Sequence, residues 1–461
     1  MTPQEGKEDR PIAALLAPDI LLMLEESPSD IAAETEEMHP ANLADVVSTL
    51  EPDKVRLILR ALQPERAADV LEYLDEELRT SVLEAMSSTQ AAALVSEMTP
   101  DDRADVLEEL DEEHADEILS KIEAEARGET ERLLAYPPES AGGLMTTEFV
   151  SIPEGMTVEA ALRGVRNVAR AGRREALYTI YATDSEGRVR GVLSLRELLA
   201  AAEGTRIEEL AWTDVVSVSA TADREEVARL TSKYDLVAVP VVDEGGRIIG
   251  VVTVDDVIDA IVEEQTEDMQ KFGGMEALDQ PYFNASFWSI LRKRGGWLVL
   301  LFIEEMFTGT VLRHHSSMLE TSVALMFFVP LIISSGGNSG SQSATLITRA
   351  LAVGDVRLRD SLRVLARELS QGIALGAFLG AIGLARALMW GNGMEMAWVV
   401  AITLLAVVLT GTVVGAMLPL AFTRLGVDPA IASSPFVASF VDVAGIFIYF
   451  AVAQQLIGLG G

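Results

Sequence analysis

The stretch Ser433-Ser-Pro-Phe-Val-Ala-Ser-Phe-Val-Asp442 opens an apolar segment that determines the character of the C-terminal part of the chain. The segment covers about 434–459, which is long enough for a helix to cross a bilayer, yet it holds one ionised side chain, Asp442. A carboxylate at that depth is expected to face other protein or a watery cavity, because lipid offers it neither partner nor solvent. Helical spacing places Ser434, Ala438 and Asp442 on one stripe, which predicts a pore lining. The alternative is an aspartate paired with a neighbouring helix.

Four apolar segments precede this one, and together they predict an all-α transmembrane domain of five helices over 295–461. The five segments are about 296–312, 321–347, 368–389, 397–422 and 434–459. Nine basic residues lie before the first span and in the loops after the second and fourth, against two on the opposite side. The positive-inside rule therefore predicts a multi-pass protein of the cell (inner) membrane, with cytoplasmic N-terminal domains and an external C-terminus.

Nearly all of the negative charge precedes this membrane domain. Residues 1–268 hold 24 Lys plus Arg and 60 Asp plus Glu, a net charge of −36, whereas residues 269–461 hold 12 and 11, a net charge of +1. Such a negative region repels nucleic acid and favours cations as partners. Cysteine is absent, which excludes thiolate metal sites and a cysteine nucleophile. We find no nucleophile with a base, no phosphate-binding loop and no histidine ligand set, so the sequence predicts a protein that is not an enzyme.

An internal repeat of 12 residues organises the chain after an N-terminal segment over 1–37. Its apolar positions are Leu50, Leu62, Leu74, Met86, Met98, Leu110 and Ile122. Proline occurs two residues after several positions of this register, where the start of a helix tolerates it. Each unit is therefore predicted to be one short helix and a turn, and the units must stack to bury their apolar faces. The result is an acidic α-solenoid over 38–135, most of whose charges are expected to be solvated.

From residue 136 the pattern changes to alternating strands and helices, and the same unit occurs twice, about 59 residues apart. The matching stretches are Gly191-Val-Leu-Ser194-Leu-Arg-Glu197 and Gly250-Val-Val-Thr253-Val-Asp-Asp256. The order of elements resembles a tandem pair of α/β CBS domains, over 136–200 and 201–265. In that family this turn binds an adenine nucleotide, so the resemblance implies a site for ATP or a similar ligand at Ser194, Glu197, Thr253 and Asp256. A Ser or Thr three residues before an acid also simply caps a helix.

An acidic connecting helix and an interfacial segment are predicted over 254–294. The helical pattern runs from Val254 to Lys271 and ends at Gly273-Gly274, and aromatic residues then precede a basic cluster, as is typical of a membrane interface. Beyond it, Glu304 and Glu305 fall inside the first span. They are compatible with a second ion site or a coupling role, and equally with a dimer contact.

The second span ends in a polar, glycine-rich stretch. The sequence is Pro330-Leu-Ile-Ile-Ser-Ser-Gly336-Gly-Asn338-Ser-Gly-Ser-Gln342. We expect an irregular backbone here, which a bilayer tolerates only where it is buried in protein or lines water. Gly336 and Asn338 are therefore predicted to border the ion path, with a flexible cytoplasmic turn as the alternative.

Several stretches together are similar to the MgtE family of magnesium channels. They are the glycine-rich stretch up to Leu346, Arg349-Ala-Leu-Ala352, Gly415-Ala-Met-Leu-Pro419 and Gly426-Val-Asp-Pro-Ala430. The resemblance implies a homodimer with its pore on the two-fold axis and Asp442 of each subunit beside the ion. Ser434 departs from the asparagine expected at that position. Mg²⁺ suits such a site because it keeps its waters and binds through one or two carboxylates.

The resemblance also implies that intracellular Mg²⁺ binds between the solenoid, the second CBS domain and the connecting helix, and closes the pore. The residues carried over are Asp101, Asp105, Asp223, Glu225, Asp235, Asp256, Asp259, Glu264, Glu267 and Asp268. Two carboxylates about 4 Å apart repel by about 4 kcal/mol at an effective dielectric near 20, so a bridging cation has much to stabilise. The alternatives are a CBS-regulated transporter of Mn²⁺, Co²⁺ or another solute, and a membrane-anchored nucleotide sensor.

Overall fold

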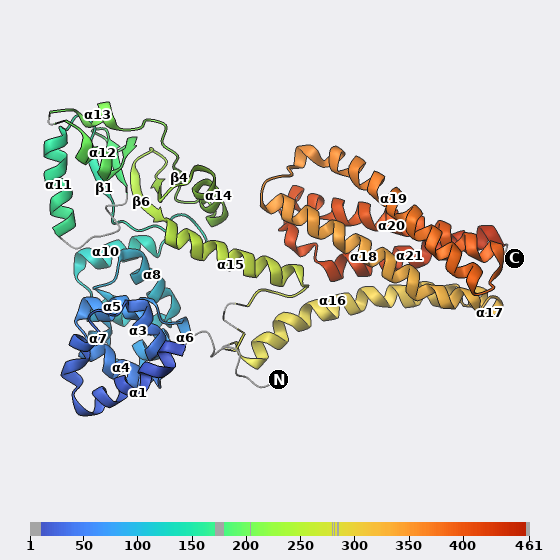
Figure 1. The fold of residues 1–461 in the computed structure, drawn as a ribbon, viewed down its shortest axis with the longest axis horizontal. Coiled ribbons are helices and arrows are strands. Elements are labelled where there is room, and N and C mark those ends of the chain that lie inside the picture. The colour runs from blue at the N-terminus through green and yellow to red at the C-terminus, as the bar shows by residue number, and fades with distance from the viewer. Residues whose placement is uncertain are drawn as a thin grey trace. The chain divides into compact units, whose positions relative to one another are not determined.

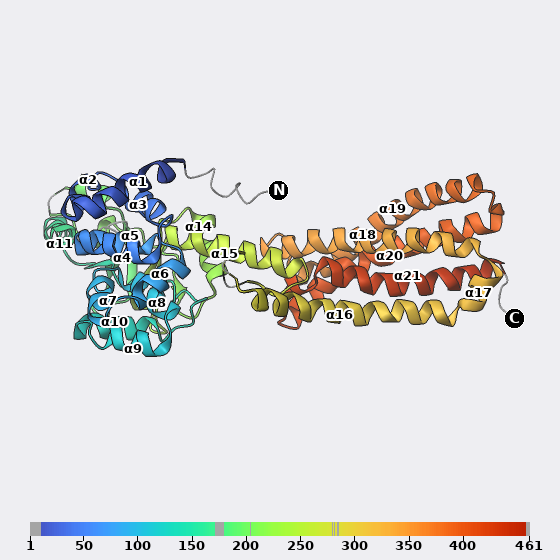
Figure 2. The ribbon, with the colours of Figure 1, turned by 90° about the horizontal axis from the view of Figure 1, so that it is seen from below.

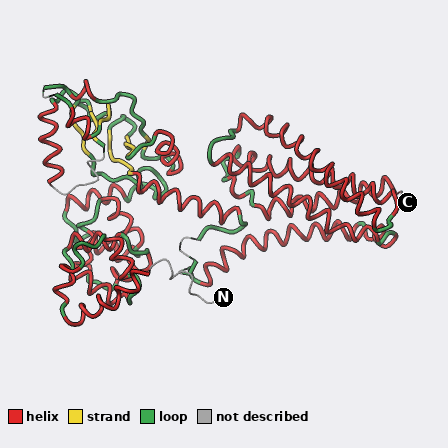
Figure 3. The backbone as a smooth tube through the Cα atoms, in the orientation of Figure 1, coloured by secondary structure: helices red, strands yellow, loops and turns green. Residues whose placement is uncertain are grey.

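The computed structural model describes residues 11–457 except 171–178, 203, 279, 281 and 284 (Figure 1). The chain forms two compact units, Met1–Ile261 and Val262–Gly461. The first unit holds a helical stack and two small sheets, and every regular element in the described part of the second unit is a helix (Figure 3).

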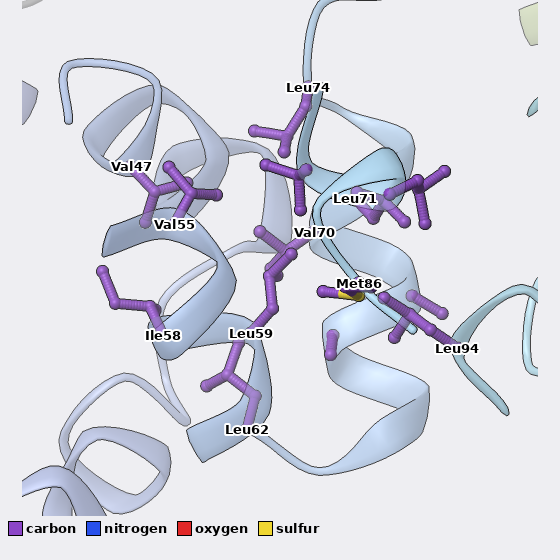
Figure 4. Packing of buried hydrophobic residues seen from close by; sticks show 14 of the residues in the cluster. Val47, Val55, Ile58, Leu59, Leu62, Val70, Leu71, Leu74, Met86 and Leu94 are labelled. Carbon is purple, nitrogen blue, oxygen red and sulfur yellow. The ribbon is translucent and has the colours of Figure 1, made fainter. Parts of the chain in front are cut away.

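Eight short helices of the first unit begin at intervals of 12 residues, which confirms the helix predicted for each repeat. They are α3 (Pro40–Val47), α4 (Pro52–Ala61), α5 (Pro64–Glu72), α6 (Glu76–Glu84), α7 (Ser88–Val95), α8 (Pro100–Glu109), α9 (Glu112–Leu119) and α10 (Ala124–Leu133). Along the stack a helix packs on its second neighbour, as α3 does on α5 and α5 on α7. Leu62, Leu74 and Met86 of the repeat are buried between these layers, whereas Leu50 is only partly buried (Figure 4). The stack is the predicted solenoid.

The segment before the repeat is also helical, which the sequence pattern did not indicate. It contains α1 (Pro11–Glu26), the 3₁₀ turn η1 (Pro28–Asp30) and α2 (Ile31–Glu34). Ile20, Leu24 and Ile31 are buried in the same core as the solenoid helices, so this segment covers an end of the stack that the repeats leave open.

Two sheets of the same design follow, which confirms the duplication. The first copy is β1 (Val150–Pro153), α11 (Val158–Arg170), β2 (Ile180–Thr183), β3 (Val189–Leu193) and α12 (Leu195–Ala200), followed by α13 (Ile207–Leu210). The second copy is β4 (Val218–Ser219), α14 (Arg224–Tyr234), β5 (Ala238–Val242), β6 (Ile248–Thr253) and α15 (Val254–Phe272). In each copy the first strand is parallel to the second, and the second is antiparallel to the third. Gly187 and Gly246 take positive φ in the two hairpin turns, where the predicted turn sequences need it.

The second unit is a bundle of long helices (Figure 2). Its elements are α16 (Phe287–His314), α17 (Ser316–Thr321), α18 (Ala324–Ala352), η3 (Leu358–Asp360), α19 (Ser361–Met389), α20 (Gly393–Arg424), η4 (Pro429–Ile431) and α21 (Ser434–Ile457). In the described part of the chain, four of these, α16, α19, α20 and α21, are long and apolar enough to cross a membrane. The fifth predicted span, α18, is equally long, but its serines and glycines lower its hydropathy, so the count of five is not confirmed.

The glycine-rich stretch is a continuous part of helix α18, so the irregular backbone expected there is wrong. The glycines allow helices to approach closely. A Cβ atom added to Gly411 of α20 would lie 2.6 Å from the carbonyl oxygen of Gly336, and one on Gly415 would collide with Gly340. Small residues on both helices bring the two backbones into contact and stabilise the regular geometry of α18.

Candidate functional site

The predicted row of Ser434, Ala438 and Asp442 occupies the first turns of α21. Asp442 is half-buried, and its Oδ1 atom is buried without a hydrogen-bond partner among the described residues. A Cβ atom added to Gly337 of α18 would lie 3.2 Å from this oxygen and 3.3 Å from the Cβ atom of Ala438. The backbone of α18 therefore forms the wall opposite the row, and a buried carboxylate oxygen faces it without a donor.

The two residues predicted on α18, Gly336 and Asn338, are the chain neighbours of Gly337. Gly336 packs against Val407 and Val441, while Asn338 is exposed and its amide donates to Ser334 Oγ at 3.3 Å. Gly337, between them, is the residue in contact with Asp442, and no pattern in the sequence distinguishes it from its neighbours.

A serine of α18 makes a second contact with the start of the row. The Ser341 hydroxyl donates to the carbonyl oxygen of Ser434 at 3.1 Å. This bond holds the first turn of α21 against α18, one helical turn beyond Gly337. The amide that the family resemblance led us to expect at residue 434 is absent, and it is the backbone carbonyl of Ser434 that accepts this bond.

A second buried carboxylate lies in the same bundle, and sequence reasoning missed it. Glu368 of α19 is only 5% exposed, and Ser343 Oγ of α18 donates to its Oε2 atom at 2.7 Å. Among the described residues no basic side chain forms an ion pair with it. An acid within a glycine-rich apolar segment was the only signal in the sequence.

An acidic cluster forms in the first unit between α8 and the start of α15. Asp101 is 7% exposed, and its Oδ1 atom has no hydrogen-bond partner. Burial and the charge of Asp101 raise the pKa of Asp256 to about 8, and burial raises the pKa of Asp101 itself. Asp105 lies at the more exposed rim. Loss of hydration and the charges of Asp101 and Asp102 raise its pKa to about 7. The arrangement concentrates negative charge that a cation would stabilise.

Two members of this cluster were not predicted. Burial and the charge of Asp101 raise the pKa of Asp102 to about 6, and the charge of Asp255 raises the pKa of Asp256 further. Both are sequence neighbours of predicted residues, so the helical turn that carries one acid brings the next into range. Asp259, one turn further along α15, is exposed, and partial loss of hydration and Asp255 raise its pKa.

The remaining predicted regulatory residues lie outside this cluster. Asp223 caps the N-terminus of α14, where its Oδ1 accepts from the backbone N–H of Glu225 at 2.8 Å, and Asp235 ends the same helix with a φ of 54°. Glu264, Glu267 and Asp268 belong to the second unit. Local helix geometry thus accounts for the positions of Asp223 and Asp235.

In the second unit an unpredicted lysine joins the end of α15 to the segment before α21. Lys271 Nζ forms ion pairs with Glu267 and, at 2.8 Å, with Asp428 Oδ2. Partial burial opposes the charge of Lys271, but its bonds to both carboxylates raise its pKa overall. Burial and the nearby Asp428 raise the pKa of Asp268. The ammonium group lies between two carboxylates, and a metal ion could bind both of them if it were not there.

Over the described ranges no three Asp, Glu or His side chains converge closely enough to form a metal-binding group. Acidic side chains that repel one another separate when no cation holds them, and Mg²⁺ contacts protein largely through its own waters. Water-mediated binding is therefore the mode that these carboxylates can support.

The nucleotide residues predicted in the CBS-like pair cap helices. Ser194 and Glu197 form a complete capping box on α12, and Trp212 Nε1 donates to Glu197 Oε1 at 2.9 Å. In the second copy the Thr253 hydroxyl donates to Asp256. Trp212, which was not predicted, places an exposed aromatic ring beside the first of these turns.

Comparison with known proteins accounts for most of the chain. The model of the MgtE intracellular N domain matches residues 38–139, the CBS domain model matches 141–204 and 207–263, and the MgtE divalent cation transporter model matches 329–452. Among solved structures, the soluble part of a magnesium transporter has a TM-score of 0.51 and 32% identity, and covers 55% of this chain and 99% of that one. The cytosolic domain of the Mg²⁺ channel MgtE in complex with ATP has a TM-score of 0.50 and 38% identity, with 53% and 99% covered.

Curated relatives extend this likeness into the membrane unit. The magnesium transporter MgtE of Thermus thermophilus is 44% identical over 336 residues, which is 73% of this chain and 74% of the relative. The magnesium transporter MgtE of Bacillus subtilis is 33% identical over 341 residues, again 73% and 74%. The helical stack, the paired sheets and the helical bundle occur here in the order of these matches, and the chain belongs to the MgtE family.

Proposed function

We propose that this protein carries Mg²⁺ across the cell membrane as a homodimer, with a pore on the two-fold axis lined by the α21 row of each subunit. The observation that carries the proposal is the buried Oδ1 atom of Asp442, which lacks a donor and faces the backbone of Gly337. An ionised carboxylate in that position is costly unless a cation or water compensates it. The relatives, which are magnesium transporters, support the choice of ion.

The chemistry of the row suits a hydrated divalent ion. Mg²⁺ gives up its waters reluctantly and is usually held by one or two carboxylates with other oxygen ligands. Two symmetry-related Asp442 carboxylates would supply the charge, and hydroxyl and carbonyl groups near Ser434 would hold waters of hydration. The charge of the ion offsets the repulsion between the carboxylates, so the pair is stable only when the pore is occupied or protonated.

We further propose that cytosolic Mg²⁺ closes the pore by binding the acidic cluster. Burial and the charges of Asp101 and Asp102 raise the pKa values of Asp105 and Asp256 to about 7 and about 8, so part of the charge is lost unless a cation stabilises it. With abundant Mg²⁺ the carboxylates are bridged, and with scarce Mg²⁺ they repel. A few such pairs suffice for a nearly complete two-state shift, which needs roughly 5.5 kcal/mol.

The proposed arrangement assigns sensing to residues 38–265, coupling to 254–294 and conduction to 295–461, with the N-terminal part cytoplasmic and the C-terminus external. An adenine nucleotide at the CBS pair is a further part of the proposal. The ATP complex of a related cytosolic domain supports it, and the hydroxyls of Ser194 and Thr253 are the groups expected to contribute.

The direct test is Mg²⁺ flux into liposomes that contain the full chain or its Asp442→Ala variant, with Asp355→Asn as the control. Asp355 is an exposed acid in the loop after α18, so its neutralisation should leave flux unchanged. Asp442→Ala should abolish Mg²⁺ flux while the protein still elutes as a folded dimer. Equal flux in both variants would refute the pore. Parallel measurements with Mn²⁺ and Co²⁺ would establish which cations the pore passes.

A further inference from the structure

The two glutamates of α16 have no role in the function proposed above. Along this helix the less exposed residues recur at helical spacing, and they include Leu301, Glu304, Thr308 and His315. Helix α16 packs on α21, beside which it lies in Figure 2. The stripe that carries Glu304 and Thr308 is therefore the face of α16 turned toward the bundle.

Measured along the helix axes, the level of Asp442 lies between the levels of Thr308 and Glu304. His315 at the end of α16 stacks on Phe450 of α21, with ring centroids 4.5 Å apart, so these residues mark one level. At about 1.5 Å per residue, Asp442 lies about 12 Å back along α21, whereas Thr308 lies about 10.5 Å and Glu304 about 16.5 Å back along α16. The electrostatic interaction of Asp442 with Glu305 and Glu304 agrees with this alignment.

Each of these three positions contributes a buried oxygen atom without a hydrogen-bond partner. They are Asp442 Oδ1, Glu304 Oε2 and Thr308 Oγ1. Thr308 is only 2% exposed. A threonine in a helix commonly donates to the carbonyl four residues earlier, and Thr310 does so to Met306 at 2.9 Å. The Thr308 hydroxyl makes no such bond, so it remains available to a ligand beside the carboxylates.

We infer that Glu304, Glu305 and Thr308 of α16 complete, with Asp442 of α21, a second position for a hydrated divalent cation in each subunit, beside the pore axis. All the groups are oxygen donors, which favour hard cations such as Mg²⁺. In the described residues the carboxylates do not converge to direct coordination, so the ion is held through its waters. This inference rests on the proposed function, because Asp442 is shared between the pore and the second position.

The second position should set the affinity of the transporter for Mg²⁺. An ion held beside Asp442 keeps its own waters and is already surrounded by negative charge, so it reaches the axis at a lower external concentration. Removing one of its ligands should therefore raise the half-saturating Mg²⁺ concentration more than it lowers the maximal rate. A residue that only supports packing would not separate these two quantities.

The experiment measures Mg²⁺ flux as a function of Mg²⁺ concentration for the full chain in liposomes. Glu304→Gln should raise the half-saturating concentration about tenfold, the scale of losing one group around a bound metal. Thr308→Val should raise it several-fold, and Thr308→Ser, which keeps the hydroxyl, should behave as the intact chain. Thr310→Val is the matched control, because Thr310 is exposed and bonded to its own helix.

The outcomes separate this inference from the proposed function. If Asp442→Ala abolishes flux while Glu304→Gln and Thr308→Val are indistinguishable from the intact chain, the second position is wrong and the pore stands. If Asp442→Ala transports as well as the intact chain, the pore fails and the second position fails with it. Should Thr308→Ser be as impaired as Thr308→Val, the hydroxyl is not a ligand, and that too contradicts the inference.

Discussion

The protein holds acidic groups in two environments that differ in what compensates the charge. In the membrane unit Asp442 presents a buried oxygen to the backbone of a neighbouring helix, with no donor in reach. In the first unit the charge of Asp101 acts on both Asp105 and Asp256, where the solenoid meets the second sheet copy, and the pKa values of all three are raised. A carboxylate oxygen that faces a helix backbone is suited to an ion that passes. Several mutually repelling carboxylates are suited to an ion whose concentration is sensed.

Among the changes that test this comparison, the largest effect is expected from adding side-chain atoms at Gly337, opposite Asp442. Gly337→Val inserts methyl groups where a Cβ atom already lies 3.2 Å from Asp442 Oδ1, at a cost of about 1–3 kcal/mol. Such a cost shifts the population of the conducting arrangement by about fivefold to about 150-fold. Mg²⁺ flux in liposomes should fall accordingly. Gly309→Val is the control, because a Cβ atom there meets nothing within 4 Å; full flux in Gly337→Val would show that this wall does not line the ion path.

Neutralising a carboxylate of the acidic cluster should stabilise the first unit. Asp256→Asn removes a repelling charge, so without Mg²⁺ the free energy of unfolding of the first unit should rise by on the order of 2 kcal/mol. The protection that Mg²⁺ normally provides should shrink, while transport through the pore is retained. Limited proteolysis of the full chain with and without Mg²⁺ measures this. Asp235→Asn, at the left-handed end of α14, is the isosteric control, and equal Mg²⁺ protection in both variants would contradict the sensor.

The pH dependence of the first unit would sharpen the same comparison. In the folded state the pKa values of Asp102, Asp105 and Asp256 lie at about 6, 7 and 8, above the ordinary value of 3.8. The folded state therefore holds protons that the unfolded chain releases, and its stability should fall as pH rises from about 4 to about 8. Hydrogen exchange of the full chain checks this. Mg²⁺ should restore most protection at the alkaline end, and stability that rises with pH would show that the carboxylates are not crowded.

Glu368 offers a third case, a buried carboxylate that does have a donor. Ser343→Ala removes the hydroxyl bonded to its Oε2 atom and should lower the free energy of unfolding by about 1–3 kcal/mol. Thermal unfolding of the full chain in detergent measures the loss. Ser370→Ala is the control, because that exposed hydroxyl bonds only to the Arg367 carbonyl of its own helix. An unchanged melting temperature for Ser343→Ala would mean that the bond to Glu368 does not stabilise the bundle.

The smallest effect is expected at Lys271. Its ion pairs with Glu267 and Asp428 are partly exposed, so Lys271→Met should change stability by no more than about 1 kcal/mol. The Mg²⁺ concentration that closes the pore should nevertheless shift, because two carboxylates lose the cation between them. Flux at several cytosolic Mg²⁺ concentrations tests this. Closure at the same concentration in both proteins would leave Lys271 with a purely structural role.

Much of the architecture could be predicted because it depends on short-range periodicity. Helices begin at Pro40, Pro52, Pro64 and Pro100 as the repeat predicts, since each unit carries its own start signal and apolar face. The duplicated strands could also be predicted, because turn sequences separate them. The helical segment before residue 38 was not, because Glu26 stands where the repeat has an apolar residue, although Pro28 keeps the proline spacing. The burial of this segment depends on the apolar end of the solenoid.

The sequence by itself determined the apolar spans, the stacked repeats, the paired sheets and the depth of Asp442, because hydrophobic spacing and helix rise act along the chain. Only the tertiary structure decided that α18 is a regular helix, that Gly337 is the residue opposite Asp442, and that Ser343 meets Glu368. These results depend on which backbones approach one another. That approach is set by glycines on two separate helices, and no one-dimensional pattern records their pairing.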